Sequence, residues 1–372
     1  MPLMYYLNNR IDDMRVMHAY CLNYNFGDYA LGQGVKNIFR QCYDISYFAE
    51  CNLQGQIFDD YFISILNKKY DVLVVGGGGI IHGAHWPNGW FWLIEQNKIK
   101  DIQIPFIVYG AGYNYFETEQ GIPEKGIEHL RETSKRAAFF SVRNDGSYER
   151  LKKQTGLNAE VIADPGFWYS LDEIPLYQEK FQPYVVVQLA NDKPEHRFGN
   201  TESQREFISN LISVLSPLSN KAHILFLPHV SEDISICNEI STFIKNSSVV
   251  DFGKYAFDRY ELAMNLYKGA KFVLAMRGHG QIIPLSFGTP VISLENHPKH
   301  RGLMELYGLG EFNVNIMSKL FADELNDKIR DLLNRIDFVQ TYIQTQNKKL
   351  YIDTKTKLLS ISQLKKYTKV EI

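Results

Sequence analysis

The sequence of 372 residues lacks the features that mark secreted, membrane-spanning or nucleic-acid-binding proteins. It has four cysteines without a CxxC pair, and no apolar run of about 18 residues, which a membrane-spanning helix needs. Lysine and arginine (40) nearly balance aspartate and glutamate (42), whereas nucleic-acid-binding chains cluster positive charge. The start, MPLMYYLNNRIDDMR, has no basic segment followed by an apolar one, so we expect a cytoplasmic protein with reduced, structural thiols.

What the chain does contain is a surplus of aromatic residues (13%) and a regular alternation of short apolar runs with amphipathic stretches. Such alternation predicts parallel sheets covered by helices on both faces. The expected strands are Val16–Leu22, Ile45–Phe48, Val72–Val75, Phe106–Tyr109, Phe139–Val142, Val161–Ala163, Val185–Leu189, Ile224–Leu227, Val249–Phe252, Phe272–Ala275 and Val291–Leu294. The clearest expected helices are Tyr29–Phe39, Phe58–Leu66, Ser203–Leu215, Ile234–Lys245, Asp258–Lys268 and Gly280–Phe287.

The polar, proline-containing stretch Glu173–Pro183 divides the pattern into two series and is typical of a linker. The predicted fold is therefore α/β, with two doubly wound Rossmann-like domains (1–175 and 184–315) facing a cleft. A helical C-terminal segment (316–372) is expected to pack back on the N-terminal domain. Its lysine-rich end is either a solvated helix or a contact with the inner face of an anionic membrane.

In such sheets ligands gather where strands end and helices begin, so the residues after each strand are the candidate site. Asn25 and Asp28 precede the helix Tyr29–Phe39. Asp28 is either the cap of that helix or a carboxylate that accepts a proton from a substrate hydroxyl.

A strand also runs into four glycines, including Gly77 and Gly78, and a loop there would let backbone N–H groups approach an anion. No Gly-Lys-Ser/Thr follows, so it is not a P-loop. His82 and His85 come next and predict hydrogen bonds to a sugar more than a metal site, because no third ligand is evident. The nearby Trp86, Trp90 and Trp92 are candidates for stacking on a sugar.

Four later strand ends carry charge. Arg143 is either a salt-bridge partner or an anion clamp, whereas Asp164-Pro165 looks mainly architectural. Arg277-Gly278-His279 precedes a helix whose free N–H groups would meet the same anion as the two side chains, although a buried, satisfied histidine is the alternative. Glu295, His297, Lys299 and Arg301 follow the next strand as a second polar cluster.

The order of these motifs, over roughly Asn23 to Gly308, resembles the polysaccharide pyruvyl transferase family. That resemblance implies a fold like the two-domain glycosyltransferase B architecture. It also implies transfer of pyruvate from phosphoenolpyruvate to hydroxyls of a sugar, as a ketal, in a surface glycan such as a capsule or exopolysaccharide, or in its lipid-linked precursor. No further cofactor, metal or nucleic acid is implied.

The resemblance assigns roles to individual residues. Arg143 and Arg277 would clamp the donor across the cleft, and His279 with the N–H groups around Gly278 would hold the phosphate. Asp28 becomes the candidate base and His279 the candidate acid, while Lys299 would reinforce phosphate binding. One departure is visible: the position after Arg143, commonly acidic in the family, is Asn144, with Asp145 next.

Two other functions stay open on the sequence. A glycosyltransferase that uses a nucleotide-sugar would share the fold and place its donor phosphates at the same helix start. A non-catalytic glycan-binding protein is the third possibility, but it would not need the charged residues that the chain retains.

Overall fold

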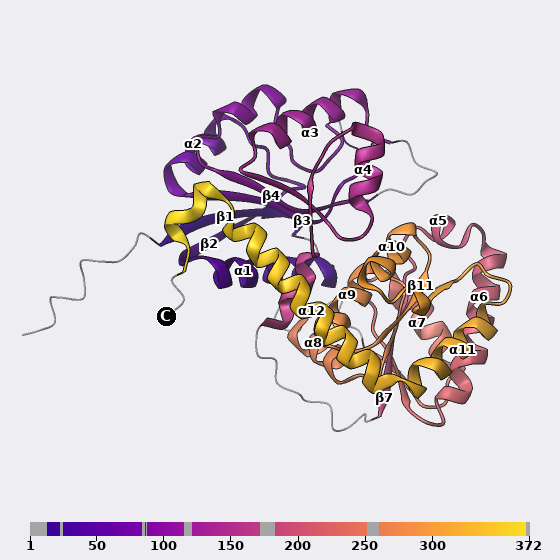
Figure 1. Cartoon of the computed structure of the whole chain (residues 1–372). Coiled ribbons are helices and arrows are strands. Elements are labelled where there is room, and N and C mark those ends of the chain that lie inside the picture. The colour runs from indigo at the N-terminus through magenta and orange to yellow at the C-terminus, as the bar shows by residue number, and fades with distance from the viewer. Residues whose placement is uncertain are drawn as a thin grey trace, which may run out of the picture.

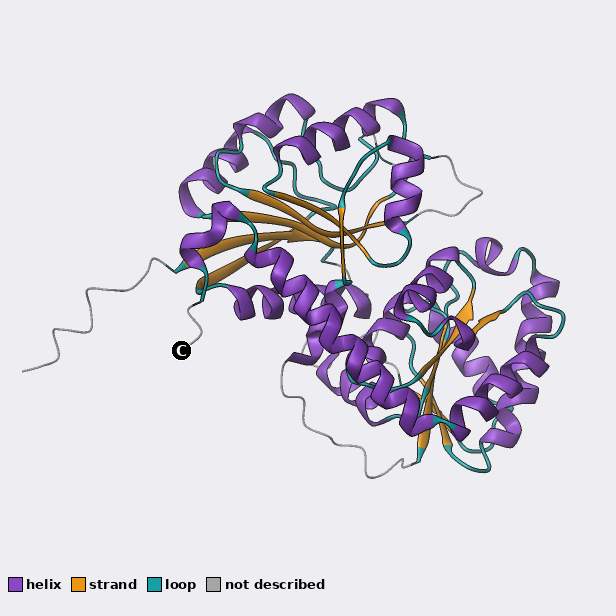
Figure 2. Ribbon diagram, viewed as in Figure 1, coloured by secondary structure: helices purple, strands orange, loops and turns teal. Residues whose placement is uncertain are grey.

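A computed structural model describes the chain over residues 13–22, 25–83, 86, 88–114, 121–171, 183–250 and 260–369. This part forms two sheets of six parallel strands, flanked by helices (Figure 1, Figure 2). The first sheet contains β1 Met14–Tyr20, β2 Ile45–Asn52, β3 Val72–Ile81, β4 Phe106–Tyr113, β5 Phe139–Arg143 and β6 Glu160–Ile162. The second contains β7 Tyr184–Gln188, β8 His223–Phe226, β9 Ser247–Val249, β10 Val273–Ala275, β11 Val291–Glu295 and β12 Asn313–Asn315.

The helices follow the strands in alternation, as two doubly wound domains require. In the N-terminal half they are α1 Phe26–Cys42, α2 Asp60–Lys69, α3 Glu124–Arg136 and α4 Ser147–Thr155, with the 3-10 helices η2 Gln96–Asp101 and η3 Pro165–Leu171. In the C-terminal half they are α5 Pro194–Phe198, α6 Thr201–Leu218, α7 Asp233–Ser241, α8 Tyr260–Gly269, α9 Gly278–Ser286, α10 Pro298–Tyr307 and the 3-10 helix η6 Gly310–Phe312. The tail is α11 Phe321–Asn334, α12 Ile336–Leu359 and the 3-10 helix η7 Ser362–Tyr367.

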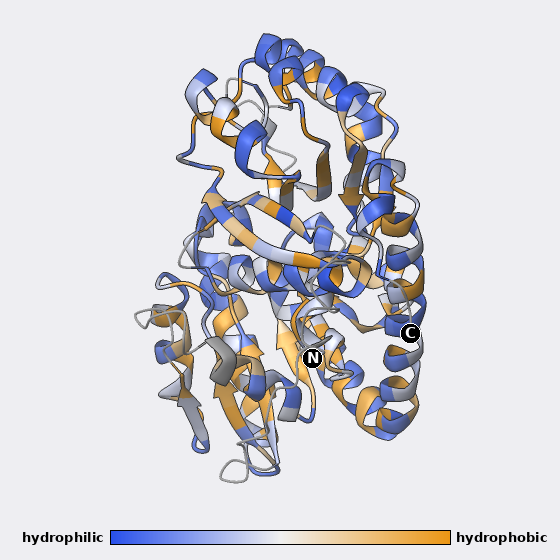
Figure 3. Cartoon of the chain, turned by 90° about the vertical axis from the view of Figure 1, so that its left-hand side faces the viewer, coloured by the Kyte–Doolittle hydropathy of each residue, from blue (hydrophilic) through white to orange (hydrophobic). Residues whose placement is uncertain are grey.

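The central strands are apolar on both sides because helices cover both faces of each sheet. Along β3, Val72 and Val74 pack into one core, whereas Leu73 and Val75 pack into the core on the opposite face. In Figure 3 the helices alternate blue and orange along their length, as expected for elements with one face toward a core.

The strand order places a crevice in each domain. The first sheet runs β2-β1-β3-β4-β5-β6 and the second β12-β11-β10-β7-β8-β9, so the winding direction changes between β1 and β3 and between β7 and β10. At such a switch point the connections leave to opposite sides, and a ligand crevice opens beyond the carboxyl ends of the two strands. The segments that follow β1, β3, β7 and β10 therefore become the candidate walls of the site.

The 3-10 helix η3 joins the two domains. The Asn37 side chain of α1 donates to the Trp168 carbonyl, at 3.1 Å. On the other side, the Phe167 ring stacks on Tyr307 of α10, with ring centres 5.6 Å apart. One apolar core runs from α1 through η3 into the second sheet, so the two crevices are held against each other.

The tail returns to the N-terminal domain, as the sequence predicts. The Lys357 ammonium in α12 donates to the Val161 carbonyl at 2.8 Å, and the Asp44 N–H donates to the Tyr367 carbonyl at 2.9 Å. An isolated antiparallel bridge between Tyr43 and Thr368 completes the contact. Figure 1 shows the long helix α12 running from beside the second domain to the first.

Most predicted elements are present, with shifted ends. The helix expected at Tyr29–Phe39 begins three residues earlier, at Phe26, and β12 was not predicted because Asn313–Asn315 is short and polar. The proposed linker lies mostly outside the described residues, as does the end of the strand expected at Val249–Phe252.

The expectation of a glycine loop after Val75 is wrong, because β3 continues through all four glycines to Ile81. A Cβ on Gly77 would lie 2.6 Å from Pro165, and one on Gly78 would lie 2.9 Å from Leu31. The missing side chains therefore let α1 and η3 approach the sheet. Gly78 also has a φ of +92°, which favours glycine.

We predict that Gly34→Ala destabilises the junction between α1 and η3. A Cβ at Gly34 would lie 1.9 Å from the Pro165 carbonyl oxygen, which is backbone and cannot turn away. The free energy of unfolding, measured in urea, should fall by about 1–3 kcal/mol despite the better helix propensity of alanine. The matched control is Gly55→Ala, where nothing lies within 4 Å and a change below about 0.5 kcal/mol is expected. Equal effects of the two variants would contradict the prediction.

Candidate active site

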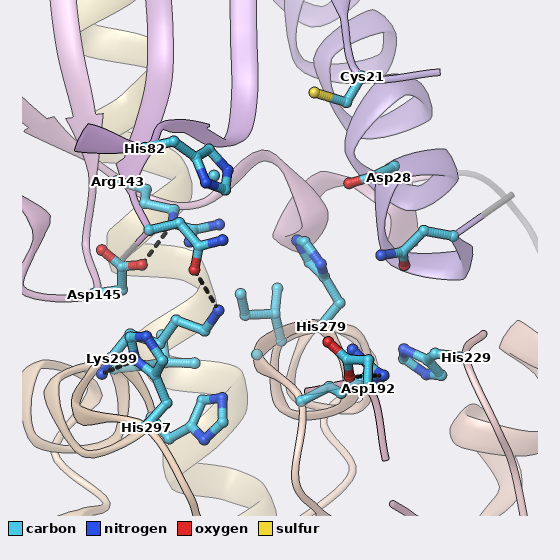
Figure 4. Close-up of a pocket in the computed structure, with 18 of the residues that line it drawn as sticks. Cys21, Asp28, His82, Arg143, Asp145, Asp192, His229, His279, His297 and Lys299 are labelled. Carbon is cyan, nitrogen blue, oxygen red and sulfur yellow. Dashed lines mark hydrogen bonds and ion pairs between the residues drawn. The ribbon is translucent and has the colours of Figure 1, made fainter. Parts of the chain in front are cut away.

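A cavity of about 300 Å³ lies between the two domains at the carboxyl ends of the central strands (Figure 4). Both domains contribute to its wall, which is mostly polar. The lining residues are Cys21, Asn25, Asp28, Gln54, Gly79, His82, Phe91, Asn114, Arg143 and Asp145 from the N-terminal half, and Asp192, Lys193, Arg197, His229, Arg277, Gly278, His279, Ile282, His297, Lys299, His300 and Leu303 from the C-terminal half. Most residues predicted from the strand ends are thus brought together.

Asn25, and not Asp28, caps α1. The Asn25 side chain accepts a hydrogen bond from the Gly27 N–H at 2.8 Å, and its backbone is extended as a cap requires. Asp28 lies one position further, inside the first turn, with its side chain half-buried at the cavity wall. The prediction that Asp28 could serve as the cap is therefore wrong.

Arg143 holds two carboxylates at the end of β5. Its Nε lies 2.5 Å from Asp145 and its Nη1 lies 3.2 Å from Asp164, and the guanidinium is only 6% exposed. Asp145 therefore supplies the acidic partner that Asn144 does not provide.

Asp164 connects the two domains. His279 of α9 places its Nε2 3.6 Å from an Asp164 oxygen, the other oxygen of which faces Arg143. Burial alone would raise the pKa of Asp164, but His279 and Arg143 beside it hold that pKa below its ordinary value. The expectation that Asp164 is mainly architectural is incomplete, because its carboxylate lies between a cation of one domain and an imidazole of the other.

The contact between the domains is close at His279. A Cβ on Gly27, in the first turn of α1, would lie 2.2 Å from the His279 Nδ1, so only glycine permits this approach. The His279 Nε2 is buried and faces the Asp164 carboxylate, at 3.6 Å, which is longer than a direct hydrogen bond.

Arg277 lies between β10 and α9 and is also paired. Its Nε donates to Asp233 at 2.8 Å, and its Nη2 contacts both Asp233 and Asp192. Asp192 in turn receives two hydrogen bonds from Arg197 Nη2, at 2.8 and 3.0 Å. Asp192 and Arg197 were missed at the sequence level. The signal was available, because Asp192 follows β7, the first strand of the second domain and one of the two strands at its switch point.

Lys299 differs from the arginines because an amide, not a carboxylate, holds its ammonium. The Nζ donates to the Asn114 side-chain oxygen at 2.8 Å (Figure 4). Burial, together with the positive charges of Arg143 and Arg197, lowers the pKa of Lys299 to about 7. Its Cε is 4.0 Å from the place where a Gly278 Cβ would be, at the start of α9, which has no side-chain cap. An anion at that point would meet the ammonium and the helix start together.

The glycine run of β3 and the loop after it contribute fewer residues to the cavity wall than predicted. His82 lines the cavity and stacks on Phe91, and Gly79 is the glycine of this run at the wall. Gly77 and Gly78 lie against η3 and α1 instead, and His85 lies outside the described residues. Glu295 and Arg301 pair with each other, 3.0 Å apart, and are not among the lining residues.

Two of the three tryptophans predicted to stack on a sugar do not line the cavity. Trp90 and Trp92 are fully buried in the core of the first domain, where the Trp90 indole N–H donates to His129 at 3.0 Å. The prediction of stacking was wrong for both because their loop turns inward and antiparallel to the end of β3 at Trp90. Trp86 remains half-buried and packs edge-on against Phe91.

Across the described residues, no group of three or more histidine, cysteine, aspartate or glutamate side chains has an arrangement suited to a metal ion. No helix of the described chain is long and apolar enough to cross a membrane.

The architecture is that of the glycosyltransferase B class. The UDP-GlcNAc 2-epimerase of Methanocaldococcus jannaschii is similar with a TM-score of 0.52 at 13% identity, over 86% of this chain and 93% of that one. A glycosyltransferase from Rickettsia africae also has a TM-score of 0.52, at 12% identity, over 94% and 99%. At these identities the likeness concerns the fold alone. A search of curated proteins finds no significant match.

The family model for polysaccharide pyruvyl transferases matches residues 25–298, from the cap of α1 to the first residue of α10. The matched segment covers both domains and most of the cavity wall. The chain therefore belongs to the polysaccharide pyruvyl transferase family and is a transferase.

We predict that anion binding in the cavity weakens as pH rises because Lys299 loses its proton. Sulfate is a suitable probe, since its charge is constant over this range. Between pH 6 and pH 8.5, sulfate affinity measured by calorimetry should fall by roughly tenfold, which corresponds to about one pKa unit of coupling. A bound anion raises the pKa of Lys299, so the lysine takes up a proton when the anion binds.

The variant Lys299→Met isolates this effect, because the cavity histidines remain in it. The part of the pH dependence that disappears belongs to Lys299. The same slope in both proteins would rule out Lys299 as the titrating group. Lys98→Met, at a surface pair with Asp60, is the matched control and should leave the wild-type slope intact.

Proposed function

We propose that this transferase moves the pyruvyl group of phosphoenolpyruvate onto two hydroxyls of a sugar and releases phosphate. The observation that carries the proposal is the cavity wall at the start of α9, where Arg277, Lys299 and the imidazole of His279 line the same cavity as the carboxylate of Asp28. A small donor with two anionic groups matches the side that carries the cations, and a neutral acceptor matches the side of Asp28. The acceptor belongs to a surface glycan or its lipid-linked precursor.

The phosphate of the donor is assigned to the side formed by Lys299, Gly278 and His279. Lys299 supplies a charge that is not neutralised by a carboxylate, and the first turn of α9 begins without a side-chain cap. A phosphate there gains charge-assisted hydrogen bonds, which are shorter and stronger than neutral ones. Its departure is helped by the same groups, since they stabilise the charge that develops on it.

The proton steps are assigned to His279 and Asp28. Protonation of the methylene carbon of phosphoenolpyruvate creates an oxocarbenium-like centre, which a sugar hydroxyl attacks at the carbon that bears phosphate. The C–O bond to phosphate then breaks, and the second hydroxyl closes the ketal while its proton leaves with the phosphate. In this proposal His279 delivers the proton to the methylene carbon, and Asp28 accepts the proton that the first hydroxyl loses.

The wall gives a reason to prefer this donor to a nucleotide-sugar. Apart from histidines, Phe91 is the only aromatic side chain among the described lining residues, and it belongs to the N-terminal domain. A base pocket in the second domain would need an apolar slot, whereas its wall here consists mainly of charged residues and histidines. The lysine-rich end of the tail is proposed to contact an anionic membrane when the acceptor is lipid-linked.

The donor is tested by thermal shift and phosphate release. Phosphoenolpyruvate should raise the melting temperature, and phosphate should be released when a panel of mono- and disaccharide acceptors is added. UDP- and GDP-sugars serve as the comparison set. Stabilisation by nucleotide-sugars without any by phosphoenolpyruvate would refute the proposal and favour a glycosyltransferase.

We predict that Asp28→Asn lowers the turnover number by about 10²–10⁴-fold, the usual contribution of a general base. The dissociation constant for phosphoenolpyruvate should stay unchanged because Asp28 lies on the acceptor side. His279→Gln should lower turnover to a similar degree. The control Asp60→Asn alters an exposed carboxylate on α2 and should keep full activity. Near-normal turnover in Asp28→Asn would show that another group is the base.

A further inference from the structure

Asp192 occupies a clamp formed by two buried arginines. Its carboxylate receives hydrogen bonds from Arg197 and from Arg277, whose side chains are only 9% and 13% exposed. The Arg197 Nε is fixed by the Asp192 carbonyl at 2.8 Å and its Nη1 by Asn296 at 2.8 Å. The two guanidinium groups therefore form a preorganised site for a carboxylate at the cavity wall.

The two aspartates of this cluster differ in how firmly they are held. Asp233 is fully buried and accepts backbone hydrogen bonds from Asn191, His229 and Val230 in addition to its pair with Arg277. Among the described residues, the Asp192 carboxylate contacts only the two arginines, and its side chain is 33% exposed. Asp233 is thus held by more partners than Asp192 and is less accessible.

The backbone beside Asp192 is unusual. Lys193, with a φ of +52°, is the only non-glycine residue of the described chain with a positive φ, and Pro194 follows it at the start of α5. A left-handed conformation at lysine costs about 1 kcal/mol, so the turn that presents Asp192 to the arginines is strained.

We propose that Arg197 and Arg277 form the subsite for the carboxylate of the donor, and that Asp192 fills this subsite until the donor displaces it. The inference rests on the proposed function, because it assigns the second anionic group of phosphoenolpyruvate. The subsite adjoins the phosphate side, since Gly278 lies between Arg277 and the Cε of Lys299. A ligand with a carboxylate and a phosphate close together can therefore reach both.

Exchange of one carboxylate for another explains how an anion enters a site whose arginines are already paired. Burial opposes the charge of Asp192, but Arg277 and Arg197 lower its pKa to about 2, so it does not leave by protonation. Instead, the carboxylate of the donor competes with Asp192 for the two arginines and displaces it. Donor binding is then weakened by the presence of Asp192, which is the opposite of what a contact residue would do.

The test measures the dissociation constant of phosphoenolpyruvate by calorimetry. Asp192→Asn removes the competing charge and should tighten binding by roughly tenfold, the value of one charge-assisted hydrogen bond. Arg197→Gln should weaken phosphoenolpyruvate by a similar factor while leaving sulfate, which uses the Lys299 side, within twofold of the wild type. In the double variant the gain from Asp192→Asn should disappear, because the clamp is missing.

The control is Asp327→Asn, which removes an exposed carboxylate from a surface pair with Arg330 and should leave the dissociation constant unchanged. If wild-type protein binds phosphoenolpyruvate and Asp192→Asn binds it equally or more weakly, then Asp192 does not compete with the donor. The inference is then overturned, and the proposed function stands. If wild-type protein binds no phosphoenolpyruvate, the proposed function falls and this inference falls with it. Thermal unfolding of each variant shows that the fold is retained.

Discussion

The site depends on one close contact, the approach of His279 to the first turn of α1. Gly27 permits this approach because it has no side chain. Asp164 stabilises it, since its buried carboxylate lies between His279 and Arg143. Separating the domains would leave Asp164 without His279, and a buried charge that loses a partner is strongly unfavourable. The contact therefore holds the two switch points face to face, and the cavity is the space left between them.

The cavity that we propose to bind an anion is not strongly positive. Each of its arginines has at least one aspartate partner, so the guanidinium groups can be buried without an uncompensated charge. This arrangement agrees with the nearly balanced charge of the whole chain. On the proposed function, an anion would therefore have to compete with these aspartates for the guanidinium groups. Lys299 is the exception, and its pKa is lowered by burial and, to a smaller degree, by the positive charges of Arg143 and Arg197.

The sequence predicted the fold and about half of the wall correctly, for a physical reason. Asp28, Arg143, Arg277 and Lys299 follow strands, and parallel sheets bring strand ends to one edge. What failed depended on packing across the fold.

Four glycines are typical of a phosphate loop, yet here they let η3 and α1 approach β3, which only the three-dimensional neighbours reveal. Trp90 and Trp92 lie in a loop by sequence, but the direction of that loop is set by the core it covers. Asp192 was missed because no motif surrounds it. Its position after β7 was the only signal, and its pairing with Arg197 follows from a turn that the sequence does not make evident.

The path of the tail has a mechanical consequence. The chain passes between the domains once from η3 to β7 and again along α12, which is anchored to the first domain through Lys357 and to the second through Asn347, a donor to the Leu285 carbonyl at 2.8 Å. Any opening of the cleft must therefore break these contacts of α12 or bend the helix, so the tail opposes separation of the two domains.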